Sequence, residues 1–189
     1  MTFSNNTFTE IGRQGMFVFG SGVNAVVTGN TYTGKGEGDW LDYGVEVGGG
    51  ATATITGNTI TDCLGVASSD GSESAGILVT DYYGPGTGAT INNNTLSNNT
   101  MGIAIGYDAT DATVVTTSGN TFTNNEFQIS AENSTNINIG DALTNNTFDK
   151  AVVIDGDYTI YSTIQGAIDA ASDGDTIEVA AGMYVEHLS

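Results

Sequence analysis

One short motif recurs along most of the chain and constrains its fold more than any other feature. It consists of Asn, Thr, a large apolar residue and then Thr or Ser, with Asp149 closing a degenerate last copy. Successive copies begin between 24 and 36 residues apart, a spacing that is typical of solenoid repeats. The copies begin at Asn6, Asn30, Asn58, Asn94, Asn120 and Asn146.

The pattern inside each copy indicates a β-strand. Its apolar residue lies between two hydroxyl residues. In a strand the apolar side chain therefore points to one face and both hydroxyl side chains point to the other. Stacked repeats would place the apolar residues in one internal file, made of Phe8, Tyr32, Ile60, Leu96, Phe122 and Phe148. The hydroxyl residues would form two outward files, made of Thr7/Thr9, Thr31/Thr33, Thr59/Thr61, Thr95/Ser97 and Thr121/Thr123.

Two further short strands accompany the motif in most repeats. One has Gly followed by alternating apolar residues, at 15–18, 44–47, 76–79 and 102–105, and continues without Gly at 127–129 and 152–154. The other precedes the motif, at 23–27, 51–55, 89–91 and 113–115. Three short strands per repeat predict an all-β, single-stranded parallel β-helix of about six to seven coils.

The Asn that opens each copy is expected to stand at a tight bend between strands. Asn tolerates the left-handed conformation, and its amide can hydrogen-bond to the Asn of the neighbouring coil. We therefore interpret Asn6, Asn30, Asn58, Asn94, Asn120 and Asn146 as a structural ladder rather than as catalytic residues.

The run from Asn93 to Ile103, Asn-Asn-Thr-Leu-Ser-Asn-Asn-Thr-Met-Gly-Ile, resembles the typical repeat of the pectin-lyase-like superfamily. The resemblance extends over essentially the whole chain and implies a right-handed coil. It predicts little about function, because this fold supports many different chemistries.

The sequence changes character after Asp155. The stretch 161–171 predicts one short amphipathic helix, with Ser162 as its N-cap and Gly174 in the turn that ends it. A strand is expected at 176–179. We therefore divide the chain into β-helix repeats at 1–155 and a cap helix plus strand at 156–189.

The second segment resembles the usual opening of a pectin-lyase-like domain. It would then begin a further β-helix, and the chain would be an excerpt of a tandem protein, as a start inside a repeat also suggests. Alternatively, the helix covers the end of this same solenoid. No cap is evident before the first repeat, so end-to-end self-association is a further hypothesis.

The charge balance excludes some partners. The chain has 22 Asp and Glu residues but only Arg13, Lys35 and Lys150 as bases, so nucleic acid and anionic membranes are poor partners. No apolar run approaches the ~18 residues that span a bilayer. The lone Cys63 excludes a disulfide framework. We expect a secreted or cell-surface protein, bacterial in origin.

No catalytic cluster is evident. The polysaccharide lyases and hydrolases that share this fold need a basic residue in a family motif or grouped carboxylates with a His, and His187 is the only His. The outward face of the Gly-containing strands would present one carboxylate among mostly apolar residues. Its central positions are predicted to be Phe17, Glu46, Leu78, Ala104, Gln128 and Val153.

The best candidate site lies in two loops that would emerge from the same sheet. Aromatic rings beside carboxylates suit sugar binding, because rings stack on apolar sugar faces and acids accept bonds from hydroxyl groups. The alternative is that Trp40 and Tyr43 seal a loop onto the core. The candidate residues are Glu37, Asp39, Trp40, Asp42, Tyr43, Tyr82 and Tyr83.

Three pairs of acidic residues are candidate calcium ligands, although none of the pairs matches a known calcium-binding motif. These pairs are Asp39 with Asp42, Asp108 with Asp111, and Asp155 with Asp157.

Three functions remain open. The favoured one is a non-catalytic β-helix segment of a large secreted or surface protein, structural, adhesive or carbohydrate-binding. The alternative is a polysaccharide-active enzyme, a lyase or hydrolase, that uses the loop near residues 37–43. The third is binding of ice or another surface through the outward Thr files.

Overall fold

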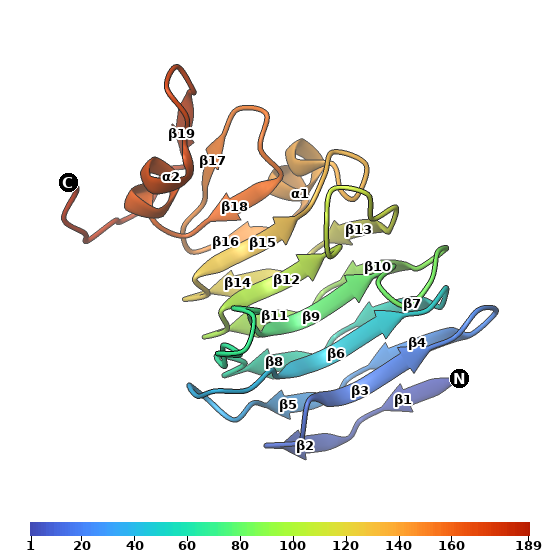
Figure 1. The fold of residues 1–189 in the computed structure, drawn as a ribbon. Helices are drawn as coiled ribbons and strands as arrows, with labels where there is room; N and C mark the ends of the chain where they lie inside the picture. Colours follow the sequence, from blue (N-terminus) through green and yellow to red (C-terminus); the bar gives the residue numbers. More distant parts are fainter.

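The computed structural model describes residues 1–189, and most of them form a stack of coils (Figure 1). Each coil contributes one strand to each of three sheets, which we call A, B and C. Sheet A consists of β1 (Thr2–Ser4), β4 (Asn24–Thr28), β7 (Thr52–Thr56), β10 (Gly88–Asn92) and β13 (Val114–Ser118). Sheet B consists of β2 (Thr7–Thr9), β5 (Thr31–Thr33), β8 (Thr59–Thr61), β11 (Thr95–Ser97), β14 (Thr121–Thr123) and β16 (Thr147–Phe148).

Sheet C begins with five parallel strands, and the predicted parallel β-helix is confirmed. These strands are β3 (Gln14–Phe19), β6 (Tyr43–Gly48), β9 (Ala75–Thr80), β12 (Met101–Ile105) and β15 (Phe127–Ala131). The stack has about five turns, slightly fewer than the predicted six to seven. No helix of the chain is long and apolar enough to cross a membrane.

The parallel stack ends because the last strands of sheet C reverse direction. β18 (Thr159–Tyr161) pairs antiparallel with β15 and lies between it and β17 (Val152–Ile154). β19 (Ile177–Val179) then pairs antiparallel with β17. The expectation that 152–154 continues the parallel strand of the preceding coils was therefore wrong, since β18 occupies that place.

A helix that the sequence analysis missed replaces the last strand of sheet A. α1 (Ile139–Asn145) follows β15, packs near β13 and leads into β16. The Asn138 side chain caps it by accepting a hydrogen bond from the Asp141 N–H at 2.9 Å. Ile139, Ala142 and Leu143 contact the core at helical spacing, a weak signal in so short an element.

The predicted C-terminal helix is present as α2 (Ile164–Ala170), with two corrections. Its N-cap is Thr163, which accepts from the Gly166 N–H, whereas the Ser162 hydroxyl donates to the Glu126 carbonyl at 2.7 Å. Ile168, which helical spacing from Ile164 predicts on the apolar face of this helix, is 37% exposed. The Glu186 carboxylate accepts from the N–H groups of Ile164 and Gln165 at 3.0 and 2.8 Å.

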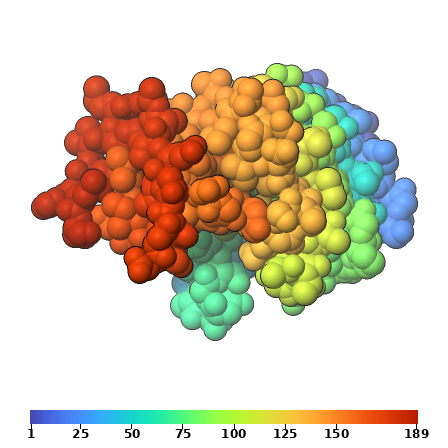
Figure 2. Space-filling view, turned by 90° about the horizontal axis from the view of Figure 1, so that it is seen from above, coloured from blue at the N-terminus to red at the C-terminus, as the bar shows by residue number.

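The C-terminal segment lies at one side of the last coils (Figure 2). α2 packs against Val152, Ile154 and Tyr161, in a small cluster separate from the main core. Its assignment as the start of a further domain stays a prediction.

The predicted internal file of sheet B is confirmed. Tyr32, Ile60, Leu96 and Phe122 are fully buried, while Phe8 and Phe148 at the two ends are partly buried. Strand register also places the flanking Thr residues in rows, for example Thr31 beside Thr59 and Thr59 beside Thr95. The row formed by the first Thr of each sheet B strand is exposed along the whole sheet.

The Gly of each sheet C strand makes room for this file. Gly15, Gly44, Gly76 and Gly102 are each the second residue of their strand. A Cβ at Gly102 would lie 2.8 Å from the Phe122 ring and 2.6 Å from the Gln128 carbonyl oxygen. Close backbone approach therefore explains why Gly recurs at this position.

The Asn ladder is confirmed, with one correction. From Asn30 onward, each ladder Asn side-chain oxygen accepts bonds from the backbone N–H and side-chain amide of the Asn in the preceding coil, as Asn94 does from Asn58 at 2.9 Å. The left-handed residue is the one before the ladder Asn, because the backbone turns there. These residues are Asn5, Gly29, Gly57, Asn93 and Gly119.

A second, shorter ladder was not predicted. The side-chain oxygen of Asn99 accepts from the Cys63 N–H at 3.1 Å, and that of Asn125 accepts from the Asn99 N–H at the same distance. Both Asn residues are buried at the bend between sheets B and C.

Candidate functional site

A cleft of about 440 Å³ opens on the outer face of sheet C. Its floor is formed by successive strands, since Glu46 of β6, Leu78 of β9, Ala104 of β12 and Ser130 of β15 lie side by side in register. Its walls come from connections between coils and from neighbouring strand residues. The wall residues include Arg13, Leu41, Tyr43, Asp70, Ser72, Glu73, Tyr82, Tyr83, Tyr107 and Glu132.

The predicted outward row was correct for its first four members and wrong for the last two. Ser130, not Gln128, lies beside Ala104. Gln128 takes the place that Gly holds in earlier strands and is fully buried, donating to Asp149 and to the Lys150 carbonyl at 2.9 Å. Val153 lies in β17, beyond the antiparallel β18.

Glu46 is the most unusual residue of the cleft, because its carboxyl group is fully buried. The Gln14 side-chain amide donates to Oε2 at 2.8 Å, while Oε1 has no hydrogen-bond partner of good geometry. Burial raises the pKa of Glu46, and the Gln14 hydrogen bond, the Arg13 charge and the nearby Tyr83 hydroxyl oppose that rise. The cleft floor therefore holds a carboxyl oxygen that lies near the Tyr83 hydroxyl but receives no hydrogen bond of good geometry.

Further carboxylates line the cleft. Burial raises the pKa of Glu73, and the charge of Glu126 adds to the effect. Burial also raises the pKa of Glu132, with Asp108 and Asp111 adding to it. Arg13 is the only basic residue in the lining, and its guanidinium lies 5.7 Å from the centre of the Tyr43 ring. Burial raises the pKa of Tyr43 to about 12.

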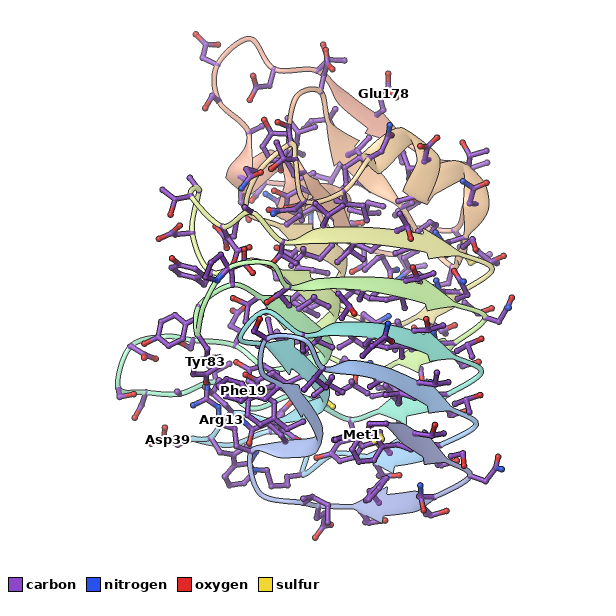
Figure 3. The ribbon with its side chains drawn as sticks, turned by 90° about the vertical axis from the view of Figure 1, so that its right-hand side faces the viewer. Met1, Arg13, Phe19, Asp39, Tyr83 and Glu178 are labelled. Carbon is purple, nitrogen blue, oxygen red and sulfur yellow. The ribbon has the colours of Figure 1, made fainter.

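Five exposed aromatic rings form a continuous row beside and along the cleft. Ring centres are 5.1 Å apart for Phe17 and Phe19, 5.6 Å for Phe19 and Tyr83, 5.0 Å for Tyr83 and Tyr82, and 5.3 Å for Tyr82 and Tyr107. We call these residues the aromatic row. Figure 3 shows Phe19 and Tyr83 together with Arg13 on one side of the stack.

The aromatic row combines residues that are distant in sequence. Phe17 and Phe19 belong to β3, Tyr82 and Tyr83 follow β9, and Tyr107 follows β12. The two central tyrosines, Tyr82 and Tyr83, were predicted from the sequence, whereas Phe19 and Tyr107 were not. Their position at or just after the ends of sheet C strands is the signal that could have found them.

The candidate loop residues separate into two groups. Tyr43, Tyr82 and Tyr83 line the cleft, whereas Glu37, Asp39, Trp40 and Asp42 do not. Asp39 accepts from the Ser68 N–H and hydroxyl at 2.7 Å each, and so joins two loops.

Trp40 and Asp42 hold their own loop together. Lys35 lies over the Trp40 ring, with Nζ 5.1 Å from its centre, and Trp40 remains 38% exposed. Asp42 is buried and accepts from the Tyr32 hydroxyl and from the Lys35 N–H.

The acidic pairs proposed for calcium mostly accept bonds from their own surroundings. Asp108 accepts from Thr110, and Asp111 from Thr80 and from the Asp81 and Thr113 N–H groups. Asp157 accepts from the Tyr161 hydroxyl at 2.7 Å, while Asp155 is exposed. The structure has no group of three or more His, Cys, Asp or Glu side chains arranged to hold a metal. Calcium binding at these pairs stays a prediction.

Comparison with known families agrees with this architecture. The sequence model described as the right-handed β-helix region matches residues 1–151. The chain belongs to the right-handed β-helix family. The family match ends just before β17, which is where the parallel stack of this β-helix protein gives way to antiparallel strands. Searches of curated proteins and of solved structures found no match.

Proposed function

We propose that this β-helix protein is a non-catalytic, carbohydrate-binding segment of a larger extracellular or cell-surface protein. The glycan would lie in the cleft over sheet C and along the aromatic row. Aromatic rings stack on the apolar faces of sugars, and carboxylates accept hydrogen bonds from sugar hydroxyl groups.

The aromatic row is the observation that carries this proposal. Its rings span the coils from β3 to the loop after β12, and each is at least 38% exposed. Exposed aromatic residues normally cost solubility, so a continuous row of them marks a binding surface. A row that crosses successive coils suits an extended polymer that lies roughly along the solenoid.

Binding to immobilised polysaccharides would test the proposal with two variants. Tyr83→Ala removes the ring that contacts both Phe19 and Tyr82, and we expect affinity to fall about tenfold or more. Trp40→Ala is the matched control, because Trp40 is equally aromatic and exposed but lies outside the cleft. Full binding by Tyr83→Ala, or loss of binding by Trp40→Ala alone, would refute the proposed surface. Circular dichroism of both variants would show that the fold is intact.

A polysaccharide-active enzyme is the second candidate, and Glu46 is the observation that favours it. Burial raises the pKa of Glu46, and this favours the protonated form that a general acid needs. Release of new reducing ends from a bound polysaccharide, abolished in Glu46→Gln, would support catalysis. Unchanged chain length after prolonged incubation would support simple binding.

The exposed Thr row on sheet B supports the third candidate, binding of ice or another regular surface. Absence of thermal hysteresis in a cooled solution of the protein would rule out ice binding.

A further inference from the structure

We propose that the cleft selects a cationic amino-sugar polymer over neutral or uronic-acid polymers. This inference rests on the proposed carbohydrate-binding function and names the class of glycan. It follows from the charge of the cleft and from the unsatisfied oxygen at its floor.

The charge of the cleft is unbalanced. Asp70, Glu73 and Glu132 stand around it and Glu46 lies at its floor, while Arg13 is the only base. Each sugar of a polyuronate carries a carboxylate, which would be repelled by these like charges when the polymer lies in the cleft. A polymer with ammonium groups would instead meet complementary charge along the cleft.

Glu46 adds an observation that is independent of the acidic side chains at the rim. It is fully buried, it lines the cleft, and its Oε1 lacks a partner. An unsatisfied buried acceptor costs free energy, which a bound donor can recover. An ammonium group carries three donors and no acceptor, so it satisfies a carboxylate oxygen better than a second carboxylate could.

Access to Glu46 requires a covering side chain to move. The Tyr83 hydroxyl lies near Glu46, and the Tyr83 ring is 40% exposed at the end of a loop. Rotation of this ring toward solvent would open the floor of the cleft and present the ring to the sugar. Tyr83 therefore connects the aromatic row to the buried carboxyl group.

Calorimetric titration with three oligosaccharides of equal length would test the inference. The probes are a glucosamine oligomer, its fully N-acetylated form and a galacturonic acid oligomer. We expect the glucosamine oligomer to bind about tenfold or more tighter than the acetylated one, and the galacturonic acid oligomer not to bind. Added salt should weaken the first interaction most, because it screens charge pairs.

Two variants separate local recognition from general charge attraction. Glu132→Gln should lower affinity for the glucosamine oligomer several-fold, a loss that corresponds to about one partly exposed ion pair. Affinity for the acetylated oligomer should not change. Glu178→Gln is the matched control, because Glu178 is an exposed residue of β19 far from the cleft (Figure 3). It removes the same charge from the molecule and should bind like the unaltered chain.

Each outcome has a distinct meaning. Tighter binding of the acetylated or galacturonic acid oligomer would overturn the amino-sugar inference but keep the proposed function. Equal losses in Glu132→Gln and Glu178→Gln would also overturn it, since attraction would then depend on net charge alone. Failure to bind any of these oligomers or any immobilised polysaccharide would overturn both proposals.

Discussion

Asn94 shows how one side chain can join three coils. Its side-chain oxygen accepts two bonds from Asn58, and its amide donates to the Asn120 side-chain oxygen and to the Ile55 carbonyl, each at 2.9 Å. We expect Asn94→Ala to lower the free energy of unfolding by about 3 kcal/mol, because buried polar partners are left unsatisfied. Urea denaturation followed by circular dichroism would measure this loss.

Thr95→Ala provides the control, because this neighbouring side chain is exposed on the outer face of sheet B. Its effect should stay within about 0.5 kcal/mol. Similar losses in the two variants would contradict a special role of the ladder.

Glu46 makes the stability of the fold depend on pH. Its pKa is raised in the folded state. Its contribution to the free energy of unfolding is therefore fully present below the ordinary Glu pKa and is lost as pH rises through the pKa of the folded state. Glu46→Gln should therefore stabilise the protein at neutral pH, by about 1–3 kcal/mol, the usual cost of an unsatisfied buried group. Thermal melts of both proteins from acidic to neutral pH should diverge as pH rises. Parallel curves, or an equal gain in Glu178→Gln, would show that burial of Glu46 is not the cause.

Single residues were predictable where the repeat determines their surroundings. The Asn ladder follows from the spacing of one motif, so the sequence alone predicts it. Burial of Glu46 could not be predicted, because the side chains that surround it, such as Gln14 and Tyr83, come from other coils. Trp40 was assigned to the candidate site for the same reason, since its loop is fixed outside the cleft by the hydrogen bonds of Asp39 with Ser68, a residue of the next coil.

At the scale of one strand, β12 shows why Gly is needed in sheet C. A methyl group at Gly102 would press on the Phe122 ring and on the backbone of β15. We expect Gly102→Ala to destabilise the protein by about 1–3 kcal/mol, the usual cost of overpacking a core. Chemical denaturation would measure it, with Gly12→Ala as the control, because nothing lies within 4 Å of a Cβ at Gly12. A neutral effect of Gly102→Ala would mean that the coils can move apart without cost.

The elements themselves were predictable in proportion to their regularity. Strands that repeat with the motif were identified, and their registers agree with the expected files. α1 is no shorter than α2, and it was missed because only Ile139, Ala142 and Leu143 follow helical spacing. The reversal at β18 was missed because no strand was predicted at 159–161, and because local sequence does not specify the direction in which neighbouring strands run.

The whole molecule carries a formal net charge of −19 at neutral pH, and this charge acts against compactness. We expect the melting temperature at neutral pH to rise with added sodium chloride, because salt screens the self-repulsion. The effect should nearly vanish close to the pI of about 4.1, where little net charge remains. Calorimetric melts at low and high salt would check both statements. A melting temperature that falls with salt at neutral pH would show that specific ion pairs outweigh the repulsion.

The antiparallel β18 also determines where a protein of this kind can change its length. Because β18 pairs antiparallel with β15 at the edge of the parallel strands of sheet C, a coil added after β15 would not be followed by another parallel strand. An extra coil inserted between β9 and β15 would meet matching neighbours above and below, including an Asn for each ladder. Duplication of one 26-residue unit, the ladder spacing from Asn94 to Asn120, should therefore lengthen the aromatic face while leaving the closing strands in place. The reach of the binding surface would then be set by the number of interior repeats, so evolution or design could adjust it one coil at a time.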